Sequence, residues 1–133
     1  MPELPEVETT LKAIKSFEKE VLNSISIYNP NLRWLVNDDI NKKIAGKRIK
    51  QIFRRAKYLI FDFHDYQLIV HLGMSGTLRI INKKDNFFKK HDHAELTFSK
   101  NKLIYNDPRR FGSIHVTKDY NKHFLIKNLG PEP

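Results

Sequence analysis

The stretch Tyr58-Leu-Ile-Phe-Asp-Phe-His-Asp-Tyr-Gln-Leu-Ile-Val-His71 contains two short apolar runs separated by the polar pair His64-Asp65. Short runs rich in β-branched and aromatic residues, joined by a tight polar turn, are typical of an antiparallel β-hairpin. Comparable runs lie on both sides of it, and we predict strands at residues 25–27, 49–52, 58–63, 68–70, 78–81, 94–98, 102–105 and 113–116. A second polar turn at residues 99–101 joins two of these strands, which again favours antiparallel sheets.

The residues ahead of these strands follow a helical period instead. Apolar residues recur there at spacings of three or four and form one stripe: Val7, Leu11, Ile14 and Phe17. Pro5 suits a first helical turn, where its missing N–H costs nothing. We predict a helix from Leu4 to about Lys19, with further short helices at residues 39–45, ended by Gly46, and at residues 119–127.

The length and composition allow one hydrophobic core. The chain has 133 residues, of which 40% are hydrophobic, and we expect residues 1–133 to form a single α+β domain, an antiparallel β-sandwich flanked by helices. No apolar stretch reaches about 18 residues, and no secretory signal is present, so we expect a cytoplasmic protein that does not bind membranes. The absence of cysteine excludes disulfides and thiolate metal sites.

The charge balance is strongly basic. The formal net charge is +9 and the sequence pI is about 9.8. Such an excess is typical of a polyanion-binding protein, although a basic surface that only aids solubility is the alternative. Six basic residues and no acidic one fall in residues 47–57: Lys47, Arg48, Lys50, Arg54, Arg55 and Lys57. This clustering favours a phosphate-binding track over a merely solvated face.

The N-terminus has a second chemical feature. Methionine before proline is normally removed, which leaves Pro2 as a free secondary amine directly ahead of the predicted helix. Such an amine can attack an aldehyde-like carbon and form an iminium, with Glu3 beside it as a proton shuttle. A retained Met1 would acylate the nitrogen and abolish this reactivity. The alternative is that Pro2 and Pro5 only mark the start of a helix.

Several motifs decide between these alternatives. They are Met1-Pro-Glu-Leu-Pro-Glu-Val-Glu-Thr9, Arg55-Ala-Lys-Tyr-Leu59, His71-Leu-Gly-Met-Ser-Gly76, His91-Asp-His93, Asp107-Pro-Arg-Arg-Phe-Gly112 and Leu129-Gly-Pro-Glu-Pro133. Together, and in this order, they resemble the N-terminal domain of bacterial formamidopyrimidine-DNA glycosylase. The resemblance runs from the first residue to the last.

This resemblance implies a catalytic group made of Pro2 as nucleophile, Glu3 as acid/base and Lys57. It implies cleavage of the N-glycosidic bond of oxidised purines, such as 8-oxoguanine and formamidopyrimidines, followed by strand cleavage through successive eliminations. Wedge residues that fill the gap left by an extruded nucleotide correspond to Met74, Arg109 and Phe111, in agreement with the energetic cost of an empty space in the base stack.

The resemblance also makes His91 a DNA phosphate ligand, with His71 a weaker candidate and His93 structural. The two-residue spacing of His91 and His93 can place both imidazoles on one strand face, as in a metal site, but the sequence offers no third or fourth ligand, so we predict no metal.

The resemblance further implies partners and missing parts. The expected partner is double-stranded DNA that contains oxidised bases or abasic sites, bound by a monomer. The family's helical domain and zinc finger have no counterpart in this sequence, so we expect no cofactor in this chain. Two alternatives stay open: a non-catalytic damaged-DNA-binding module or inactive fragment, and an enzyme like endonuclease VIII that acts on oxidised pyrimidines. Within this resemblance, the motifs Leu4-Pro-Glu-Val-Glu-Thr9 and His71-Leu-Gly-Met-Ser-Gly76 favour the purine-specific branch.

Overall fold

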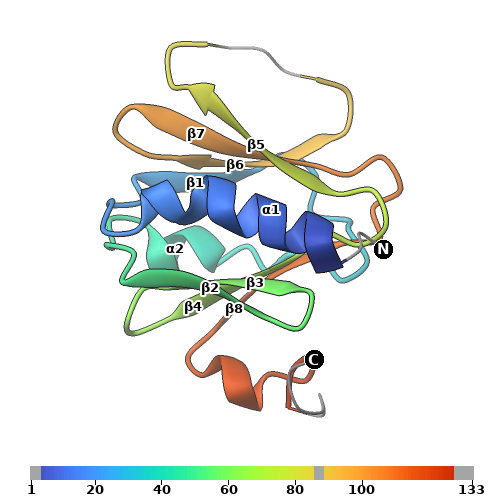
Figure 1. Ribbon diagram of the computed structural model, residues 1–133. Coiled ribbons are helices and arrows are strands. Elements are labelled where there is room, and N and C mark those ends of the chain that lie inside the picture. Colours follow the sequence, from blue (N-terminus) through green and yellow to red (C-terminus); the bar gives the residue numbers. More distant parts are fainter. Residues whose placement is uncertain (1–3, 86–88, 128–133) are drawn as a thin grey trace.

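The computed structural model describes residues 4–85 and 89–127. Within these residues the strands are β1 (Ser24–Ile27), β2 (Gln51–Arg55), β3 (Tyr58–Asp62), β4 (Gln67–His71), β5 (Thr77–Asn82), β6 (Asp92–Thr97), β7 (Asn101–Asn106) and β8 (Ser113–Thr117). They form two four-stranded antiparallel sheets, a first sheet in the order β1-β6-β7-β5 and a second in the order β2-β3-β4-β8. The two sheets lie one above the other (Figure 1), which confirms the predicted α+β sandwich.

The hairpin quoted from the sequence lies at the centre of the second sheet. Its strands β3 and β4 pair with Leu59 opposite Val70 and Phe61 opposite Leu68, and all four side chains are buried in the core between the sheets. The intervening Ile60 and Ile69 face the other way and are also buried. These strands are therefore apolar on both faces, which explains why their sequence is a continuous apolar run rather than an alternation.

The outer face of the second sheet is covered by the C-terminal segment. Ile126 is buried there in one cluster with Ile60 and Ile69, and the ring of Tyr120 lies 5.2 Å from that of Phe53. The helix predicted at residues 119–127 is wrong over most of its length. Only the single 3-10 turn η2 (Tyr120–Lys122) forms, capped by Asp119, whose side chain accepts a hydrogen bond from the Asn121 N–H, and turns follow it.

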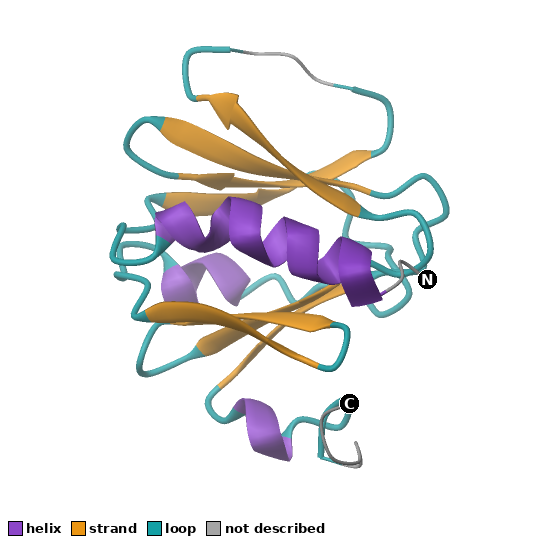
Figure 2. Cartoon of the chain, in the orientation of Figure 1, coloured by secondary structure: helices purple, strands orange, loops and turns teal. Residues whose placement is uncertain are grey.

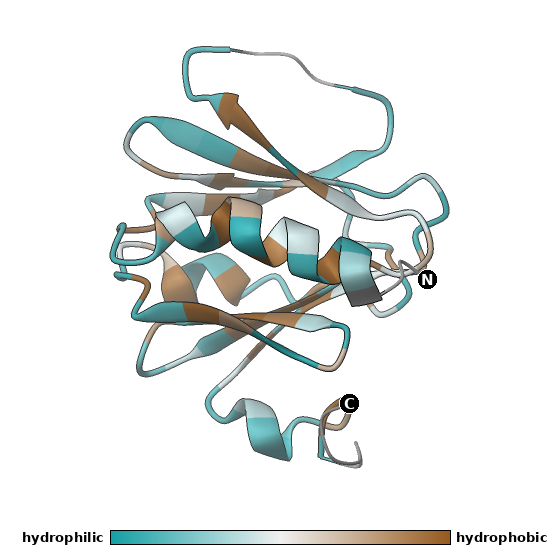
Figure 3. Cartoon of the chain, viewed as in Figure 1, coloured by the Kyte–Doolittle hydropathy of each residue, from teal (hydrophilic) through white to brown (hydrophobic). Residues whose placement is uncertain are grey.

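Two helices close the open sides of the sandwich (Figures 1 and 2). Helix α1 (Leu4–Ile14) packs against the outer strands β2 and β5, and α2 (Ile40–Ile44) packs against the outer strands β1 and β8. Apolar and polar residues alternate around α1 (Figure 3), and its apolar stripe of Val7, Leu11 and Ile14 is buried. None of the described helices is long and apolar enough to cross a membrane.

The first helix is shorter than predicted. It ends at Ile14 and continues as the 3-10 turn η1 (Lys15–Phe17). Lys19 has left-handed backbone with φ 74°, and its N–H donates to the Ile49 carbonyl at 2.8 Å instead of to a helical partner. The apolar stripe continues to the buried Phe17, so periodicity alone placed the end of the helix too late.

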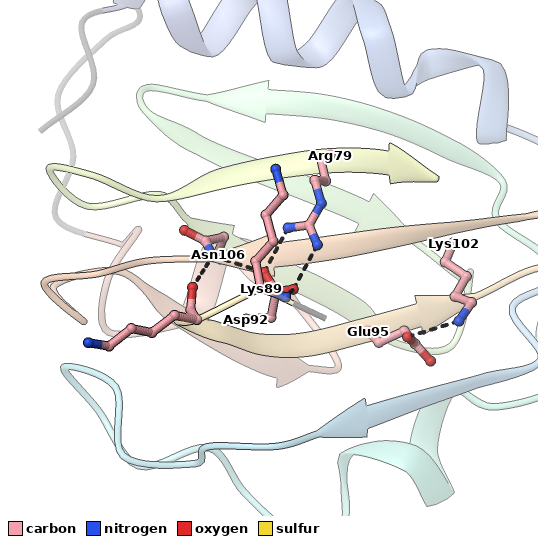
Figure 4. Close-up of polar contacts among 7 residues, drawn as sticks. Arg79, Lys89, Asp92, Glu95, Lys102 and Asn106 are labelled. Carbon is pink, nitrogen blue, oxygen red and sulfur yellow. Dashed lines mark hydrogen bonds and ion pairs between the residues drawn. The ribbon is translucent and has the colours of Figure 1, made fainter. Parts of the chain in front are cut away.

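A polar cluster lies on the first sheet (Figure 4). The Arg79 guanidinium donates two hydrogen bonds of 2.7 Å to the two carboxylate oxygens of Asp92, a residue that is 4% exposed. The Asn106 amide donates to the same carboxylate at 2.8 Å, and Lys102 forms an ion pair with Glu95 at 3.3 Å. Each of these cations is therefore neutralised by a carboxylate within the sheet.

Candidate nucleic-acid interface

Two loops cross between the sheets at the same end of the sandwich. Residues 72–76 connect β4 to β5, and residues 107–112 connect β7 to β8. The loops start and finish at paired positions, because His71 lies opposite Ser113 and Thr77 lies opposite Asn106. Figure 1 shows both loops at the end where α1 begins. The residues 71–76 and 107–112 that formed separate sequence motifs are thus neighbours in space.

Asp107 holds these two loops together. Its side chain is fully buried and accepts hydrogen bonds from the Ser75 hydroxyl at 2.8 Å and from the Gly112 N–H at 2.8 Å. It also accepts from the Tyr105 hydroxyl at 2.7 Å and from the Arg110 N–H at 3.1 Å. Sequence reasoning assigned no role to this aspartate, although an Asp-Pro pair ahead of a glycine is a recognisable turn signal.

Glycines allow the loops to approach this closely. Gly73 has φ 65°, and a Cβ atom there would lie 2.5 Å from the Gly112 nitrogen. A Cβ atom at Gly112 would overlap the Tyr105 hydroxyl and the His71 carbonyl. The backbones of the two loops therefore touch at positions where only glycine fits.

The predicted wedge residues lie at the tips of these loops. Met74 is 51% exposed and Phe111 is 42% exposed. The Arg109 guanidinium lies 5.1 Å from the centre of the Phe111 ring, a cation–π distance. The structure thus brings Met74, Arg109 and Phe111 together as an exposed apolar and cationic tip.

Lys57 lies in the turn between β2 and β3, at the same end. The preceding Ala56 has left-handed backbone with φ 53°, which reverses the chain. Lys57 is half-buried, and it forms no hydrogen bond or ion pair with any residue in the described part of the chain. Its charge is close enough to His71 to lower the pKa of that imidazole.

His71 is the last residue of β4 and is 8% exposed. Its ring lies 4.7 Å from the Tyr58 ring, and its Nε2 atom is buried without a hydrogen-bond partner in residues 4–85 and 89–127. Burial, and then the charges of Arg33 and Lys57, lower the pKa of His71 to about 4, so the imidazole is neutral near pH 7.

A cavity of about 220 Å³ adjoins this imidazole, and it is lined by Arg33, Trp34, Tyr58, His71, Ser113 and Leu125. Sequence reasoning missed Arg33, whose N–H donates to the Gly112 carbonyl at 3.2 Å and ties its loop to the β7–β8 loop. No local pattern marks this arginine, because only the tertiary structure brings residue 33 beside residue 112.

The two histidines of the His-Asp-His motif have different surroundings. His93 is buried, its Nε2 atom lies 2.7 Å from the Asp107 carbonyl oxygen, and its Nδ1 atom lies 3.4 Å from the Asn29 amide. These contacts agree with a structural role for His93. His91 is half-buried with φ 72°, and its carbonyl accepts a hydrogen bond from the Asp107 N–H at 3.1 Å. His91 therefore borders the same loop end.

The basic stretch 47–57 does not form one continuous track. Lys47 pairs with Asp65 at 3.2 Å, and Arg54 forms an ion pair with Glu8 of α1. Successive strand residues also point to opposite faces, so Arg54 and Arg55 cannot share a surface. The structure instead places cations from several segments at the loop end. Arg33, Lys57, Arg109 and Arg110 form no ion pair with any carboxylate among the described residues.

Three further predictions concern the N-terminus and metals. Pro2 and Glu3 lie outside the described residues. The first described residue, Leu4, starts α1, whose Glu8 contacts Arg54 close to the Lys57 turn. Across residues 4–85 and 89–127, no group of three or more histidine, cysteine, aspartate or glutamate residues is arranged to hold a metal ion.

Comparisons with known proteins agree with this geometry. The sequence model of the formamidopyrimidine-DNA glycosylase N-terminal domain matches residues 1–114. The formamidopyrimidine-DNA glycosylases of Marinobacter nauticus and Alcanivorax borkumensis are 47% and 44% identical over the whole chain, which covers 50% and 49% of their lengths. The chain thus spans about half the length of the curated relatives it matches.

Solved structures give the same result. The Lactococcus lactis enzyme bound non-covalently to DNA with an AP site matches with a TM-score of 0.88 and 36% identity, over 98% of this chain and 52% of that one. The same enzyme with Fapy-dG-containing DNA gives a TM-score of 0.81 and 35% identity, over 90% of this chain and 45% of that one. The order of motifs, the loop geometry and these matches agree, and the chain belongs to the formamidopyrimidine-DNA glycosylase N-terminal domain family.

Proposed function

We propose that this chain is the catalytic and DNA-binding half of a base excision repair enzyme that removes oxidised purines from double-stranded DNA and then cleaves the strand. The observation that carries the proposal is the exposed tip of Met74, Arg109 and Phe111 beside cations that have no carboxylate partner in residues 4–85 and 89–127. The Lactococcus lactis relative, which binds DNA with an AP site or Fapy-dG, supports the same class of substrate.

The tip suits the removal of a nucleotide from the stack. An extruded base leaves a gap that costs a few kcal/mol, and inserted apolar or planar side chains offset part of that cost. Met74 and Phe111 supply the apolar surface, and Arg109 supplies a planar cation that faces the unpaired base. Exposed apolar side chains at a loop tip are costly in water, and this cost is recovered when they enter the duplex.

The surrounding cations suit the DNA backbone. Arg33, Lys57 and Arg110 are available to phosphates because no carboxylate of the described chain competes for them. His71 and His91 are proposed phosphate ligands at the same end. Since His71 is neutral near pH 7, it would act as a hydrogen-bond donor rather than as a cation.

The chemistry is assigned to Pro2, Glu3 and Lys57. The Pro2 amine attacks C1′ of the damaged nucleotide, the C1′–N bond to the base breaks, and an iminium between Pro2 and the opened sugar permits elimination. Glu3 moves protons, and Lys57 supplies a cation near the reacting sugar. Two residues of extended chain span about 7 Å at most, and α1 starts at the loop end, so this assignment is compatible with the fold.

The remaining assignments follow from the same proposal. We assign the chain to the bacterial cytoplasm, as a monomer on double-stranded DNA. We assign zinc binding to the part of the enzyme that this sequence lacks. The residues present do not fit a four-cysteine site, since the sequence has no cysteine.

Trapping of the iminium tests the proposal. The chain, with Met1 removed, is incubated with duplex DNA that contains one abasic site, and borohydride is added. The abasic site supplies the aldehyde without base recognition, so we expect a covalent protein–DNA adduct on a denaturing gel. Pro2→Gly should reduce its yield, and Lys57→Ala should slow its formation without abolishing DNA binding.

The matched control is the same chain with Met1 retained, because its proline nitrogen is an amide and cannot form an iminium. An adduct of equal yield with this control would contradict the role of Pro2. If the processed chain binds abasic DNA but gives no adduct, the non-catalytic damaged-DNA-binding module is the better description.

A further inference from the structure

The buried Asp107 carboxylate uses its full capacity for hydrogen bonds. Oδ1 accepts from the Ser75 hydroxyl and the Arg110 N–H, and Oδ2 accepts from the Tyr105 hydroxyl and the Gly112 N–H. An ionised carboxylate offers about four acceptor positions, and all four are occupied here by neutral donors. The group therefore works as a fixed junction rather than as one half of an ion pair.

Each residue of the exposed tip is adjacent in sequence to a group that binds this junction. Met74 precedes Ser75, and Arg109 precedes Arg110. Phe111 lies between Arg110 and Gly112, both of which donate their N–H groups to Asp107. The Ser75 hydroxyl oxygen also accepts the Arg109 N–H at 3.3 Å, so the two loops are linked twice at this point.

The junction also fixes strained and buried groups. Arg110 has left-handed backbone with φ 57°, which is costly for a side chain with a Cβ, and its N–H is held by both the side chain and the carbonyl of Asp107. Tyr105 is fully buried, and burial together with its bond to Asp107 raises the pKa of its hydroxyl, which therefore stays a donor. Through Tyr105 the junction is anchored to the core of the first sheet.

We propose that Asp107 is a positioning residue that sets the spacing of Met74, Arg109 and Phe111, and that discrimination of damaged from intact DNA depends on it. The second half of this statement rests on the proposed function, whereas the first half concerns the free protein. General affinity for duplex DNA does not depend on Asp107, because the cations of the loop end are carried by several separate segments.

Asp107→Asn tests the positioning without a change of size. An amide has one acceptor oxygen, and its NH₂ group would face one hydroxyl, which can turn to accept, and one backbone N–H, which cannot, so at least one of the four bonds is lost and a donor is left facing a donor. Ser75→Ala removes the bond to Asp107 and the bond from the Arg109 N–H, but Arg109 is exposed and its N–H can bond to water, so the effect should be smaller and in the same direction. Glu95→Gln is the control, because it makes the same change of a carboxylate to an amide, here at a half-buried residue of the polar cluster that is paired with Lys102.

The first readout needs no DNA. The sequence has two methionines, Met1 and Met74, so a chain with Met1 removed and labelled with ¹³C-methyl methionine gives one NMR signal that reports on the tip. We expect this signal to shift towards the value of an unstructured peptide in Asp107→Asn, less so in Ser75→Ala, and to stay in place in Glu95→Gln. An unchanged Met74 signal in Asp107→Asn would overturn the positioning role, whether or not the chain acts on DNA.

The second readout is the ratio of affinities for abasic and intact duplex. Asp107→Asn should lower this ratio by about tenfold, which corresponds to the loss of about one strong hydrogen bond's contribution, and should leave affinity for intact duplex nearly unchanged. An equal loss for both duplexes would mean that Asp107 only supports the fold, and would overturn the proposal. If the parent chain itself shows no preference for abasic DNA, the proposed function fails, and the NMR comparison still decides whether Asp107 positions the tip.

Discussion

The polar cluster and the loop end use charge in opposite ways. In the polar cluster, Arg79 and Lys102 are each paired with a carboxylate of the same sheet. At the loop end, Arg33, Lys57 and Arg109 have no carboxylate partner among the described residues, and the buried Asp107 is surrounded by neutral donors instead. The cations of the polar cluster are therefore neutralised within the first sheet. Those of the loop end have no carboxylate partner in the described part of the chain and can bind a polyanion such as DNA.

The two buried aspartates make the same contrast at the level of single residues. Asp92 is balanced by the two-pronged contact of Arg79, a geometry that stabilises a buried carboxylate. Asp107 has no such cation among the described residues, and three of its four hydrogen bonds come from the two loops, with the fourth from Tyr105 of β7. Asp92 therefore belongs to the sheet, and Asp107 belongs to the loops that the sheet supports.

Arg79→Ala is the strongest test of this contrast. It leaves the Asp92 carboxylate, whose side chain is 1% exposed, without its cation. Loss of one partner of a buried pair costs about 3 kcal/mol of unfolding free energy, and we expect a loss of this order in denaturant unfolding. The preference for abasic over intact DNA should not change.

The control for Arg79→Ala is Lys15→Ala, which removes an exposed ion pair with Glu18 and should cost less than about 1 kcal/mol. A loss of stability as small for Arg79→Ala as for this control would show that the polar cluster does not stabilise the sheet.

The two regions should also respond to acid in different pH ranges. At the loop end, burial and the charges of Arg33 and Lys57 lower the pKa of His71 to about 4. The unfolded chain takes up a proton near pH 6.5 but the folded chain does not, so this contribution is present above pH 6.5 and lost as the pH falls towards 4. At about pH 5 the share of His71 in this loss should be on the order of 2 kcal/mol, and His71→Phe should remove that share. Burial also lowers the pKa of His115 to about 4, so a further loss in the same range should persist in this variant.

The polar cluster should respond only in stronger acid. Burial alone would raise the pKa of Asp92, but hydrogen bonds from Arg79, Asn106 and the Lys89 N–H lower it to about 2. A carboxylate with a lowered pKa contributes stability above about pH 4, and the contribution is lost as the pH falls from there towards 2. Unfolding curves at several pH values check both ranges. If His71→Phe changed the loss below pH 4 and not the loss above it, this assignment would be wrong.

The smallest expected effect concerns salt. Each cation that neutralises a DNA phosphate contributes about 0.9 to the slope of log affinity against log salt concentration. Arg33→Gln should lower the slope by about this amount, because the Arg33 guanidinium forms no ion pair with a described carboxylate. Lys102→Gln should leave the slope unchanged, because that ammonium is paired with Glu95. Equal slopes for Arg33→Gln and the parent chain would remove Arg33 from the interface.

Local sequence patterns predicted the elements well and their arrangement less well. The stripe of Val7, Leu11 and Ile14 and the runs around Ile60 and Ile69 gave a helix and two strands that the structure confirms. Residues 119–127 were predicted as a helix, but they form the single 3-10 turn η2 followed by turns, with Ile126 packed on the outer face of the second sheet. The strand order β1-β6-β7-β5 could not be predicted, since it pairs segments far apart in the chain.

The candidate site was predictable in its residues but not in its organisation. The wedge residues and Lys57 were assigned from motifs, and the structure places them at one end of the sandwich. Arg33 and Asp107 were missed for different reasons. Arg33 has no motif around it. Asp107 lies inside a motif, but only the tertiary structure shows that its carboxylate is buried and bonded by both loops. The pairing of Arg54 with Glu8 likewise depends on α1 lying beside β2, which the basic composition of residues 47–57 does not reveal.

The position of the two helices has a consequence for how this chain behaves at high concentration. Open sheets present unpaired backbone groups along their outermost strands, and another polypeptide can add to them as an extra strand, which is how many β-rich proteins aggregate. Here β2 and β5 have α1 alongside, and β1 and β8 have α2 alongside, so every outermost strand of the two sheets has a helix as its neighbour. A strand from a second molecule would therefore meet a helix along part of each of these strands.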